Sequence, residues 1–507
     1  MGIWLIIFIS LALSTLIKLI IYHISSAKSP TPNLPPGPSP IPIFGSSLWL
    51  TTSVFDLESA LHSLHSKFGP ILTLHTGTRP TIFIADRSIA HQALIQQNSI
   101  FADRPPALGM EIINTSNQLT ISSAFYGPTW RILRRNLTAK ILHPLNIKAY
   151  AHTRKRALQI LKDRIESEFK ERGEVQVMSH FQYAMFCLIA FMCLGDNLEE
   201  NEIKIIEEVQ RPLLLNFVEF SVFSFWPSLT KFLFKKRWDE YMRIRKNQEN
   251  VLIPLIRSRK EKRLSRNQET ENNLLLSYVD TLMDLELPDD KRKLEEQEIV
   301  SLLSEVFNGG TETTSTALQW IMANLVKHPQ IQENLYIEIK EVVKETIISE
   351  DELQKLPYLK AVVLEGLRRH PPAHMVVPHA VSEDTILGNY LIPKNGSVNF
   401  MVAEMGWDSK VWEDPAAFKP ERFMTEEVFD MSGNREIKMM PFGVGRRMCP
   451  GYSLALLHLE YLVGNLVWSY EWKAGNEDDI DLSEKLEFSV VMKFPLQARI
   501  IPRRNQI

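Results

Sequence analysis

The chain has 507 residues, with 57 basic and 60 acidic side chains and a formal net charge of -3. This balance excludes the basic excess that a nucleic-acid-binding surface usually needs, so we expect no nucleic-acid partner. Cys187, Cys193 and Cys449 are the three cysteines. An odd and sparse set does not make a disulfide framework, and it fits a reducing compartment.

The first residues predict a membrane anchor. The run from Ile3 to Ile24 is apolar except for Lys18, and roughly 20 such residues span a bilayer core as a helix. A cleaved secretory signal is the alternative, but no basic segment precedes the run and no small-residue cleavage motif follows it. Because basic flanks stay cytoplasmic and Lys28 follows the run, we expect residues 1–26 to anchor a chain that faces the cytosol.

A proline-rich connector comes next. The stretch from Pro30 to Pro42 is dense in proline, which fixes φ and removes backbone donors, so residues 27–43 are predicted to form a stiff hinge. No second Pro/Gly-rich linker and no internal repeat follow. We therefore expect residues 44–507 to form a single domain.

Helical patterns dominate this domain. The segment Leu294 to Lys327 is one of the longest, with apolar residues on one stripe and a basic last turn before Pro329. Strand signals occur in four short segments, at residues 71–75, 81–85, 384–400 and 486–501. The predicted fold class is mainly α with a smaller β region.

The segment Arg211 to Lys235 is strongly apolar and raises the question of a second membrane span. Glu219, Pro227 and Lys231 lie inside it, and charged residues are costly inside a bilayer. We therefore expect buried or membrane-dipping helices there.

A lone cysteine in a glycine-rich loop is the strongest chemical signal. The loop Phe442-Gly-Val-Gly-Arg-Arg-Met-Cys-Pro-Gly451 precedes an apolar helix predicted over residues 453–468. N–H groups at a helix N-terminus stabilise a thiolate, and glycines let the backbone approach a planar ligand closely. Arg447 could pair with an anionic group on that ligand. A structural cysteine is the alternative; Met448 replaces the third glycine of a dinucleotide loop, and a zinc site lacks partners.

The long helix carries a second signal, Gly309-Gly-Thr-Glu-Thr-Thr314. Two adjacent glycines in a helix interior cost roughly 1 kcal/mol each relative to alanine, so a flat cofactor against the backbone is one reason to keep them. Thr313 can turn its hydroxyl to the Gly309 carbonyl and bend the helix, with the ionisable Glu312 beside it. A buried carboxylate and hydroxyl suit proton delivery, and a kink without chemistry is the alternative.

Two further patterns pair side chains on helix faces. Glu365 and Arg368 are spaced i,i+3, and Arg422 could bridge the same carboxylate. Trp130 and Arg134 are spaced i,i+4. Taken alone, the first pattern predicts a surface ion pair that contributes little to stability, and the second predicts a solvated basic helix.

Together these motifs resemble the cytochrome P450 family. Its haem-binding signature, F-x-x-G-x-R-x-C-x-G, is matched at each fixed position. The segment 309–314 resembles the family's oxygen-activation motif, and Glu365, Arg368 and Arg422 resemble its buried structural triad. The wording of Glu365 to Pro372 looks like plant members, specifically family 89, subfamily A.

This resemblance implies a role for each motif. Cys449 becomes the axial ligand of the iron in haem b, where a thiolate favours O–O cleavage. Glu312 and Thr313 become the catalytic residues that carry protons to iron-bound dioxygen. The implied cofactor-binding residues are Cys449, Trp130, Arg134, His379, Phe442, Gly445, Arg447 and Gly451.

The resemblance also implies a reaction. We expect a monooxygenase of the endoplasmic reticulum membrane that inserts one oxygen atom from O2 into a small lipophilic metabolite of plant specialised metabolism. Its electrons should come from NADPH through NADPH–cytochrome P450 reductase, because the chain has no flavin or nicotinamide motif; cytochrome b5 is a further candidate partner, and membrane lipid another. The alternatives are a reductase-independent isomerase or lyase, which usually lacks the acid–threonine pair, and a non-catalytic haem-binding membrane protein.

Overall fold

The structure, a computed structural model, describes residues 10, 13–18, 34–39, 57–76, 79–196, 198–224, 227–265, 275–426, 429–475 and 480–503. The chain divides into two compact units. The first consists of Met1–Pro105 with Val377–Met401, and the second of Pro106–Val376 with Val402–Ile507. Most of the predicted anchor, and both predicted boundaries of the hinge, lie outside the described residues.

The first unit contains a four-stranded sheet in the order β1-β2-β7-β4. Its strands are β1 (Ile71–Thr76), β2 (Arg79–Ile84), β4 (His379–Ala380) and β7 (Ser397–Phe400). Strands β2 and β7 are parallel, and the other neighbours are antiparallel. The hairpin of β5 (Thr385–Leu387) and β6 (Tyr390–Ile392) turns at Gly388 and Asn389, whose φ values of 55° and 70° suit a two-residue turn. The helical segments are α3 (Leu57–Phe68), α4 (Arg87–His91) and the π-helical η2 (Gln92–Gln96).

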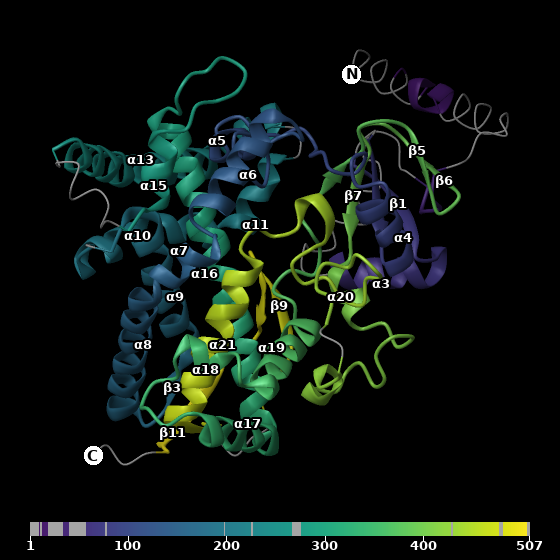
Figure 1. Ribbon diagram of the computed structural model, residues 1–507. Helices are drawn as coiled ribbons and strands as arrows, with labels where there is room; N and C mark the ends of the chain where they lie inside the picture. Colours follow the sequence, from purple (N-terminus) through teal and green to yellow (C-terminus); the bar gives the residue numbers. More distant parts are fainter. Residues whose placement is uncertain are drawn as a thin grey trace, which may run out of the picture. The chain divides into compact units, whose positions relative to one another are not determined.

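The second unit is mainly helical (Figure 1). Its longer helices are α6 (Pro128–Lys140), α8 (Ala151–Arg172), α9 (Val177–Leu194), α10 (Glu200–Leu215), α13 (Lys235–Leu264), α16 (Glu296–Lys327), α17 (Pro329–Val342), α19 (Pro357–Arg369) and α21 (Tyr452–Ser469). Its shorter helical segments are α5 (Met110–Asn114), α7 (Pro144–Ala149), α11 (Phe217–Phe220), η3 (Ser221–Ser224), α12 (Pro227–Leu233), α15 (Tyr278–Met283), α18 (Glu350–Leu353), α20 (Val402–Gly406), η4 (Pro420–Phe423) and η5 (Gly445–Arg447).

The β part of the second unit is small. A three-stranded sheet has the order β3-β11-β8, and β9 pairs with β10 in a hairpin. These strands are β3 (Val175–Gln176), β8 (Tyr470–Ala474), β9 (Glu484–Leu486), β10 (Val490–Met492) and β11 (Gln497–Pro502). The predicted class, mainly α with a smaller β region, is confirmed. Each of the four segments predicted to form strands contains at least one strand.

Helix α16 is the centre of the second unit. A capping box between Glu295 and Glu298 starts it, and Pro329 begins the next helix directly after its end, which agrees with the predicted segment to within two residues. It packs against α9, α13, α19 and α21 (Figure 1). Leu302 and Phe307 belong to the core cluster shared with α9, and Trp320 to the one shared with α19 and α21.

Helix α9 is apolar over most of its surface. Among the residues that the structure describes, it alone is long and apolar enough to cross a membrane, but 83% of it is buried inside the protein. It is therefore a core helix, because a helix that is hydrophobic all round is buried either in a protein or in a bilayer. Its two cysteines, Cys187 and Cys193, lie in the same core cluster as α16.

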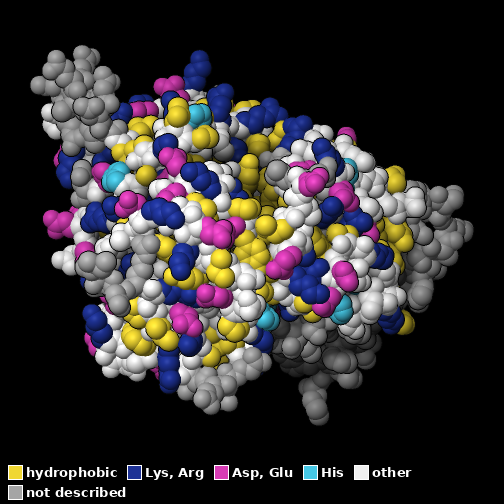
Figure 2. Space-filling view, turned by 60° about the horizontal axis from the view of Figure 1, so that its bottom comes forward, with side chains coloured by type: hydrophobic (Ala, Val, Ile, Leu, Met, Phe, Trp, Pro, Cys, Tyr) yellow, Lys and Arg dark blue, Asp and Glu magenta, His cyan; other side chains and the backbone are white. Residues whose placement is uncertain are grey.

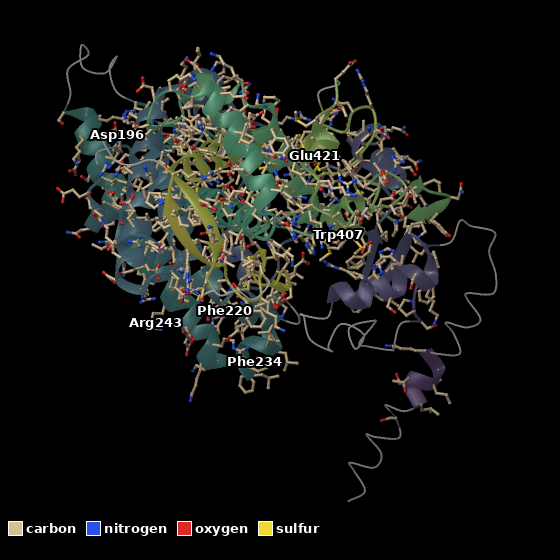
Figure 3. The ribbon with its side chains drawn as sticks, turned by 90° about the horizontal axis from the view of Figure 1, so that it is seen from below. Asp196, Phe220, Phe234, Arg243, Trp407 and Glu421 are labelled. Atoms are coloured by element: carbon tan, nitrogen blue, oxygen red, sulfur yellow. The ribbon has the colours of Figure 1, made fainter. Side chains whose placement is uncertain are left out.

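The apolar segment from Arg211 to Lys235 consists of the end of α10 and the short segments α11, η3 and α12. Phe220 and Phe223 are buried, whereas Phe232 is 81% exposed and Phe234 is 41% exposed. Figure 3 labels Phe220, in α11, and Phe234, which lies between α12 and α13; both α11 and α12 pack against α13. A continuous span does not form from these short helices, and the prediction of buried or membrane-dipping helices agrees with this arrangement.

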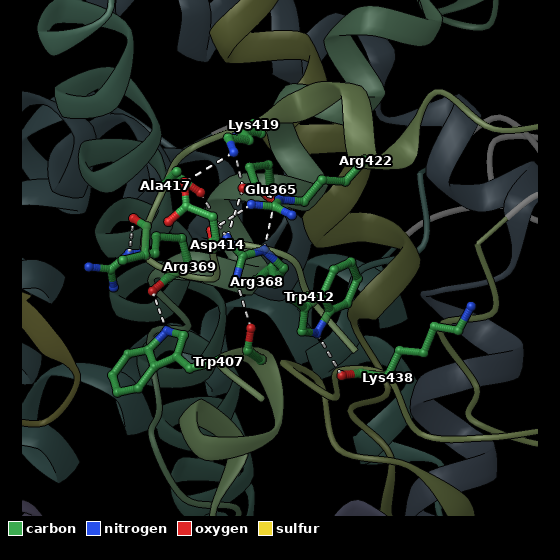
Figure 4. Close-up of polar contacts among 12 residues, drawn as sticks. Glu365, Arg368, Arg369, Trp407, Trp412, Asp414, Ala417, Lys419, Arg422 and Lys438 are labelled. Atoms are coloured by element: carbon green, nitrogen blue, oxygen red, sulfur yellow. Dashed lines mark hydrogen bonds and ion pairs between the residues drawn. The ribbon is translucent and has the colours of Figure 1, made fainter. Parts of the chain in front are cut away.

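The Glu365 triad ties α19 to the segment after α20 (Figure 4). Arg368 donates from Nε and Nη2 to the two Glu365 carboxylate oxygens at 2.7 and 2.8 Å, and Arg422 Nε lies 3.3 Å from Oε1. Glu365 and Arg368 are buried, and Arg368 Nη1 also donates to the Gly406 carbonyl at 2.7 Å. The structure thus brings these three predicted residues together inside the unit, where breaking the pair would leave a buried charge uncompensated.

We expect Glu365→Gln to destabilise the fold. The amide has the same size but removes the negative charge between two guanidinium groups, and losing one partner of a buried ion pair costs about 3–5 kcal/mol. Urea unfolding followed by circular dichroism measures this loss. Glu200→Gln is the control, because its ion pair with Lys204 is exposed and such pairs contribute about 0–1 kcal/mol. Equal shifts of the unfolding midpoint in the two variants would contradict the structural role of the triad.

Candidate active site

The cysteine loop is closed by backbone hydrogen bonding. The Cys449 N–H donates to the Phe442 carbonyl at 2.8 Å. Gly443 and Gly445 have φ of 63° and 72°, a region that side-chain-bearing residues rarely adopt, so the turn requires glycine at both positions. Gly451 caps the N-terminus of α21, and a Cβ there would lie 4.0 Å from the Cys449 sulfur. The loop therefore places the sulfur directly before an 18-residue helix.

The surroundings of the Cys449 thiol act on its ionisation in opposite directions. Burial raises its pKa, whereas the hydrogen bond from the Gly451 N–H and the charge of Arg134 lower it because they favour the thiolate. Burial raises the pKa of Cys187 to about 12, although a hydrogen bond with Tyr183 opposes the rise, and it raises the pKa of Cys193 still further. Cys449 differs from both because it lies directly before a helix, where a backbone N–H favours its thiolate.

Three of the residues predicted to bind haem, Trp130, Arg134 and Arg447, lie together at the cysteine loop, and we call them the haem cradle. Arg134 Nη2 donates to the Met448 carbonyl at 2.6 Å. The Arg447 guanidinium lies over the Trp130 ring at 4.6 Å from its centre, and the Trp130 Nε1–H donates to the Ile121 carbonyl at 3.1 Å. Burial lowers the pKa of Arg134, while the nearby Cys449 raises it. Two guanidinium groups thus adjoin the loop that carries the sulfur.

The glycines of α16 serve different purposes. A Cβ on Gly309 would meet no atom within 4 Å, so this face of the helix is open. A Cβ on Gly310 would lie 2.7 Å from Ile189 on α9, so that glycine allows close helix packing instead. The prediction that both glycines admit a flat cofactor thus fits Gly309, whereas the close approach of α9 accounts for Gly310. The helix remains continuous through this stretch.

The acid–threonine pair has the predicted local geometry. Thr313 Oγ1 donates to the Gly309 carbonyl at 2.7 Å, one turn back along the helix. Glu312 points elsewhere: both its carboxylate oxygens accept from Gln182 Nε2, at 3.0 and 3.2 Å. Gln182 Oε1 in turn accepts from Arg211 Nη2 at 2.8 Å. Burial raises the pKa of Glu312, and Gln182 and Arg211 oppose that rise.

Gln182 and Arg211 were not predicted from the sequence. They lie on α9 and α10, far from Glu312 along the chain, and no motif or spacing marks them. Together they form a polar route, because the Arg211 side chain is 40% exposed and pairs with Glu207 at 3.6 Å. The route leads from the protein surface to the glycine-rich turn of α16.

The chain matches the Cytochrome P450 family model over residues 35–499. It is 48% identical over 513 residues to cytochrome P450 89A9 of Arabidopsis thaliana, covering 98% of each chain. It is 30% identical to corytuberine synthase of Coptis japonica over 96% of this chain and 97% of the relative, and 28% identical to isoflavone 3'-hydroxylase of Medicago truncatula over 94% of each. The chain belongs to the cytochrome P450 family. The resemblance to plant family 89 is confirmed as well.

Membership of the P450 family makes haem the implied cofactor, and the donor set fits it. The described residues contain no group of three or more His, Cys, Asp or Glu side chains placed to share a metal ion. Haem carries ring nitrogens of its own, so Cys449 is the protein ligand that its iron would need. Arg134 and Arg447 would supply positive charge for its carboxylates, and the open face at Gly309 would leave room for it beside α16.

His379 and Phe442 complete the predicted set. His379 belongs to the first unit, in β4, where its Nδ1 lies 2.6 Å from the Phe101 carbonyl oxygen. The Phe442 ring lies edge-on to that of Tyr452 at 6.4 Å between centres. The contacts of His379, Trp130, Arg134 and Arg447 with haem propionates stay predictions.

We expect Cys449→Ser to abolish oxygenation and to remove the red-shifted Soret band of a thiolate–iron–carbonyl complex, because serine is a poor substitute for a thiolate ligand. The measurement is the reduced, carbon-monoxide-bound absorption spectrum. Cys187→Ala serves as the control, because it also removes a thiol, but one that is buried in α9. A Cys449→Ser protein with the wild-type spectrum would contradict the ligand assignment.

Proposed function

We propose that this P450 is a monooxygenase of the endoplasmic reticulum membrane. The net reaction is R–H + O2 + NADPH + H+ giving R–OH, H2O and NADP+, with haem b held by Cys449. Haem supplies the redox chemistry that activates O2. The observation that carries the proposal is that the second unit contains both the Cys449 loop and, on α16, the acid Glu312 and the threonine Thr313.

The residues of this chain supply the protons that the reaction consumes. A carboxyl group whose pKa is raised by burial holds a proton closer to neutral pH, which suits Glu312 for general acid work. Gln182, which is itself bound by Arg211, holds the Glu312 carboxyl in place. Because Glu312 is partly exposed, a proton that leaves the carboxyl can be replaced from solvent. Thr313 Oγ1 presents its oxygen on the open side of Gly309 and can pass a proton on.

Electrons come from a separate protein, NADPH–cytochrome P450 reductase, with cytochrome b5 as a second donor. Exposed basic side chains lie on α6, namely Arg131, Arg135 and Lys140, and on the cysteine loop at Arg446. The guanidinium groups of Arg131 and Arg446 lie over the same Tyr126 ring. Elsewhere basic and acidic side chains are interspersed, as on the face in Figure 2. A local concentration of positive charge steers an acidic partner toward the side of the protein that carries Cys449.

Residues 1–26 anchor the chain in the membrane, with the folded part in the cytosol. The exposed apolar residues of the segment from Leu215 to Phe234 provide a second contact with lipid. Phe232 and Leu233 are 81% and 60% exposed, and Lys231 directly precedes them in the chain. Apolar side chains flanked by lysines suit the interface of a bilayer.

The substrate is a small lipophilic metabolite of plant specialised metabolism. Two relatives carry names that support this proposal: isoflavone 3'-hydroxylase is named for the compound that it hydroxylates, and corytuberine synthase for the compound that it forms. An isomerase or lyase that needs no reductase is the second candidate, and a non-catalytic haem protein the third. Turnover without NADPH would favour the former, and haem binding without O2 consumption the latter.

Thr313→Ala tests the proposal. The variant should keep the thiolate–CO spectrum and continue to consume NADPH, but the yield of oxygenated product per NADPH should fall at least about tenfold, because general acid–base groups contribute factors of this size or more. The missing electrons should appear as hydrogen peroxide. Product, peroxide and NADPH are measured in reconstituted membranes with added reductase.

The matched control is Ser315→Ala. Ser315 Oγ makes the same kind of bond, to the Thr311 carbonyl at 2.8 Å, but is fully buried. This variant should retain wild-type coupling of NADPH to product. If Thr313→Ala stays fully coupled, or if both variants lose haem equally, the threonine serves helix geometry and not proton delivery.

A further inference from the structure

A short segment of the second unit, residues 116–124, links α16 to the cysteine loop; we call it the strap. It begins with three successive residues in the left-handed region, Ser116, Asn117 and Gln118, with φ of 46°, 59° and 62°. Such residues are unfavourable and persist only where their surroundings hold them. Ser116 Oγ lies 2.8 Å from Ser301 Oγ on α16, so the strap starts against that helix.

One turn further along α16, the Glu305 carboxylate receives the middle of the strap. Its Oε2 accepts from the Ile121 N–H at 2.9 Å and its Oε1 from the Ser122 N–H at 2.6 Å. The hydroxyls of Thr120 and Ser122 also hydrogen-bond to it. Burial raises the pKa of Glu305, and these donors oppose the rise because they favour the charged form. Three consecutive residues of the strap are thus bound to one side chain.

The carbonyl groups of the strap point to different partners. The Ile121 carbonyl accepts from Trp130 Nε1 at 3.1 Å and from Arg447 Nη1 at 3.3 Å. The Ala124 carbonyl accepts from Arg447 Nη2 at 2.7 Å. The N–H groups of Ile121 and Ser122 are therefore bound by α16. The strap's carbonyl groups bind two side chains of the predicted haem cradle, Trp130 and Arg447.

We propose that Glu305 is a positioning residue of the haem cradle, which acts on Arg447 and Trp130 through the strap. The inference rests on the proposed function, since it requires that Arg447 and Trp130 hold the cofactor. Glu305, Gly309 and Thr313 follow one another at intervals of four along α16. The helix that carries the proton-delivery pair therefore also sets the geometry of the cradle.

Glu305→Gln removes the charge without changing the size of the side chain, and it replaces one acceptor oxygen by an amide donor. Amide hydrogen exchange in the holoenzyme should become at least about tenfold faster at Ile121 and Ser122, because hydrogen bonds to a charged group are the stronger kind. Transfer of haem to apomyoglobin should accelerate by a similar factor. The thiolate–CO spectrum should persist, because the bond that closes the cysteine loop is intact.

Glu298→Gln is the matched control. Glu298 is another carboxylate of α16 with little exposure, but it accepts from Arg292 at 2.7 and 2.8 Å and from the Glu295 N–H. This variant should lower the unfolding midpoint without changing exchange at Ile121 and Ser122 or the rate of haem transfer. If the two variants accelerate haem transfer equally, Glu305 contributes only to general stability and the inference is overturned.

A double-mutant cycle separates this inference from the proposed function. In an Arg447→Leu background, Glu305→Gln should accelerate haem transfer less than it does in the wild type, because both changes act through the contacts of the strap with Arg447. Independent, additive effects would overturn the inference. If the Arg447→Leu variant transfers haem at the wild-type rate, Arg447 does not hold the cofactor as the proposed function requires. The role of Glu305 would then be refuted as well.

Discussion

The hydrogen bond from the Cys449 N–H to the Phe442 carbonyl, 2.8 Å long, fixes the sulfur on which the proposed chemistry depends. It closes the cysteine loop at the N-terminus of α21, where the Gly451 N–H favours the thiolate against the effect of burial. Glycines at 443 and 445 are needed because the loop turns through positive φ there. Replacing either glycine would strain the loop and displace the sulfur.

The second constraint acts on helix α16, whose partly buried carboxylates Glu305 and Glu312 need polar partners. Glu305 is covered by donors of the strap, and Glu312 by Gln182. A buried carboxyl group with partners stays in place, whereas one without partners would cost several kcal/mol. The raised pKa of Glu312 follows from the same burial, so packing and proton chemistry have one cause.

The sequence was informative where one local feature determines the outcome. The Thr313–Gly309 bond, the limits of α16 and the gathering of Glu365 with Arg368 follow from spacing along a single helix. The signature around Cys449 was sufficient to identify the family, which the comparison with known P450 proteins confirms.

Contacts between distant segments could not be predicted in this way. The bonds of Gln182 to Glu312 and of the strap to Glu305 join residues more than a hundred positions apart, and neither belongs to a motif. Gly310 was predicted to leave room for a cofactor against the backbone, because nothing in the sequence indicates that Ile189 of α9 approaches it. Whether two helices pack closely depends on how they are placed relative to each other. The pattern of apolar residues along either helix alone does not determine this.

The coordination of iron by Cys449 is the claim on which the account rests. Iron K-edge X-ray absorption on the purified wild-type holoenzyme measures it directly, because sulfur and nitrogen scatterers are distinguishable by distance and amplitude. The account predicts one sulfur ligand together with the four nitrogens of the porphyrin. An iron coordinated by nitrogen and oxygen alone would contradict it.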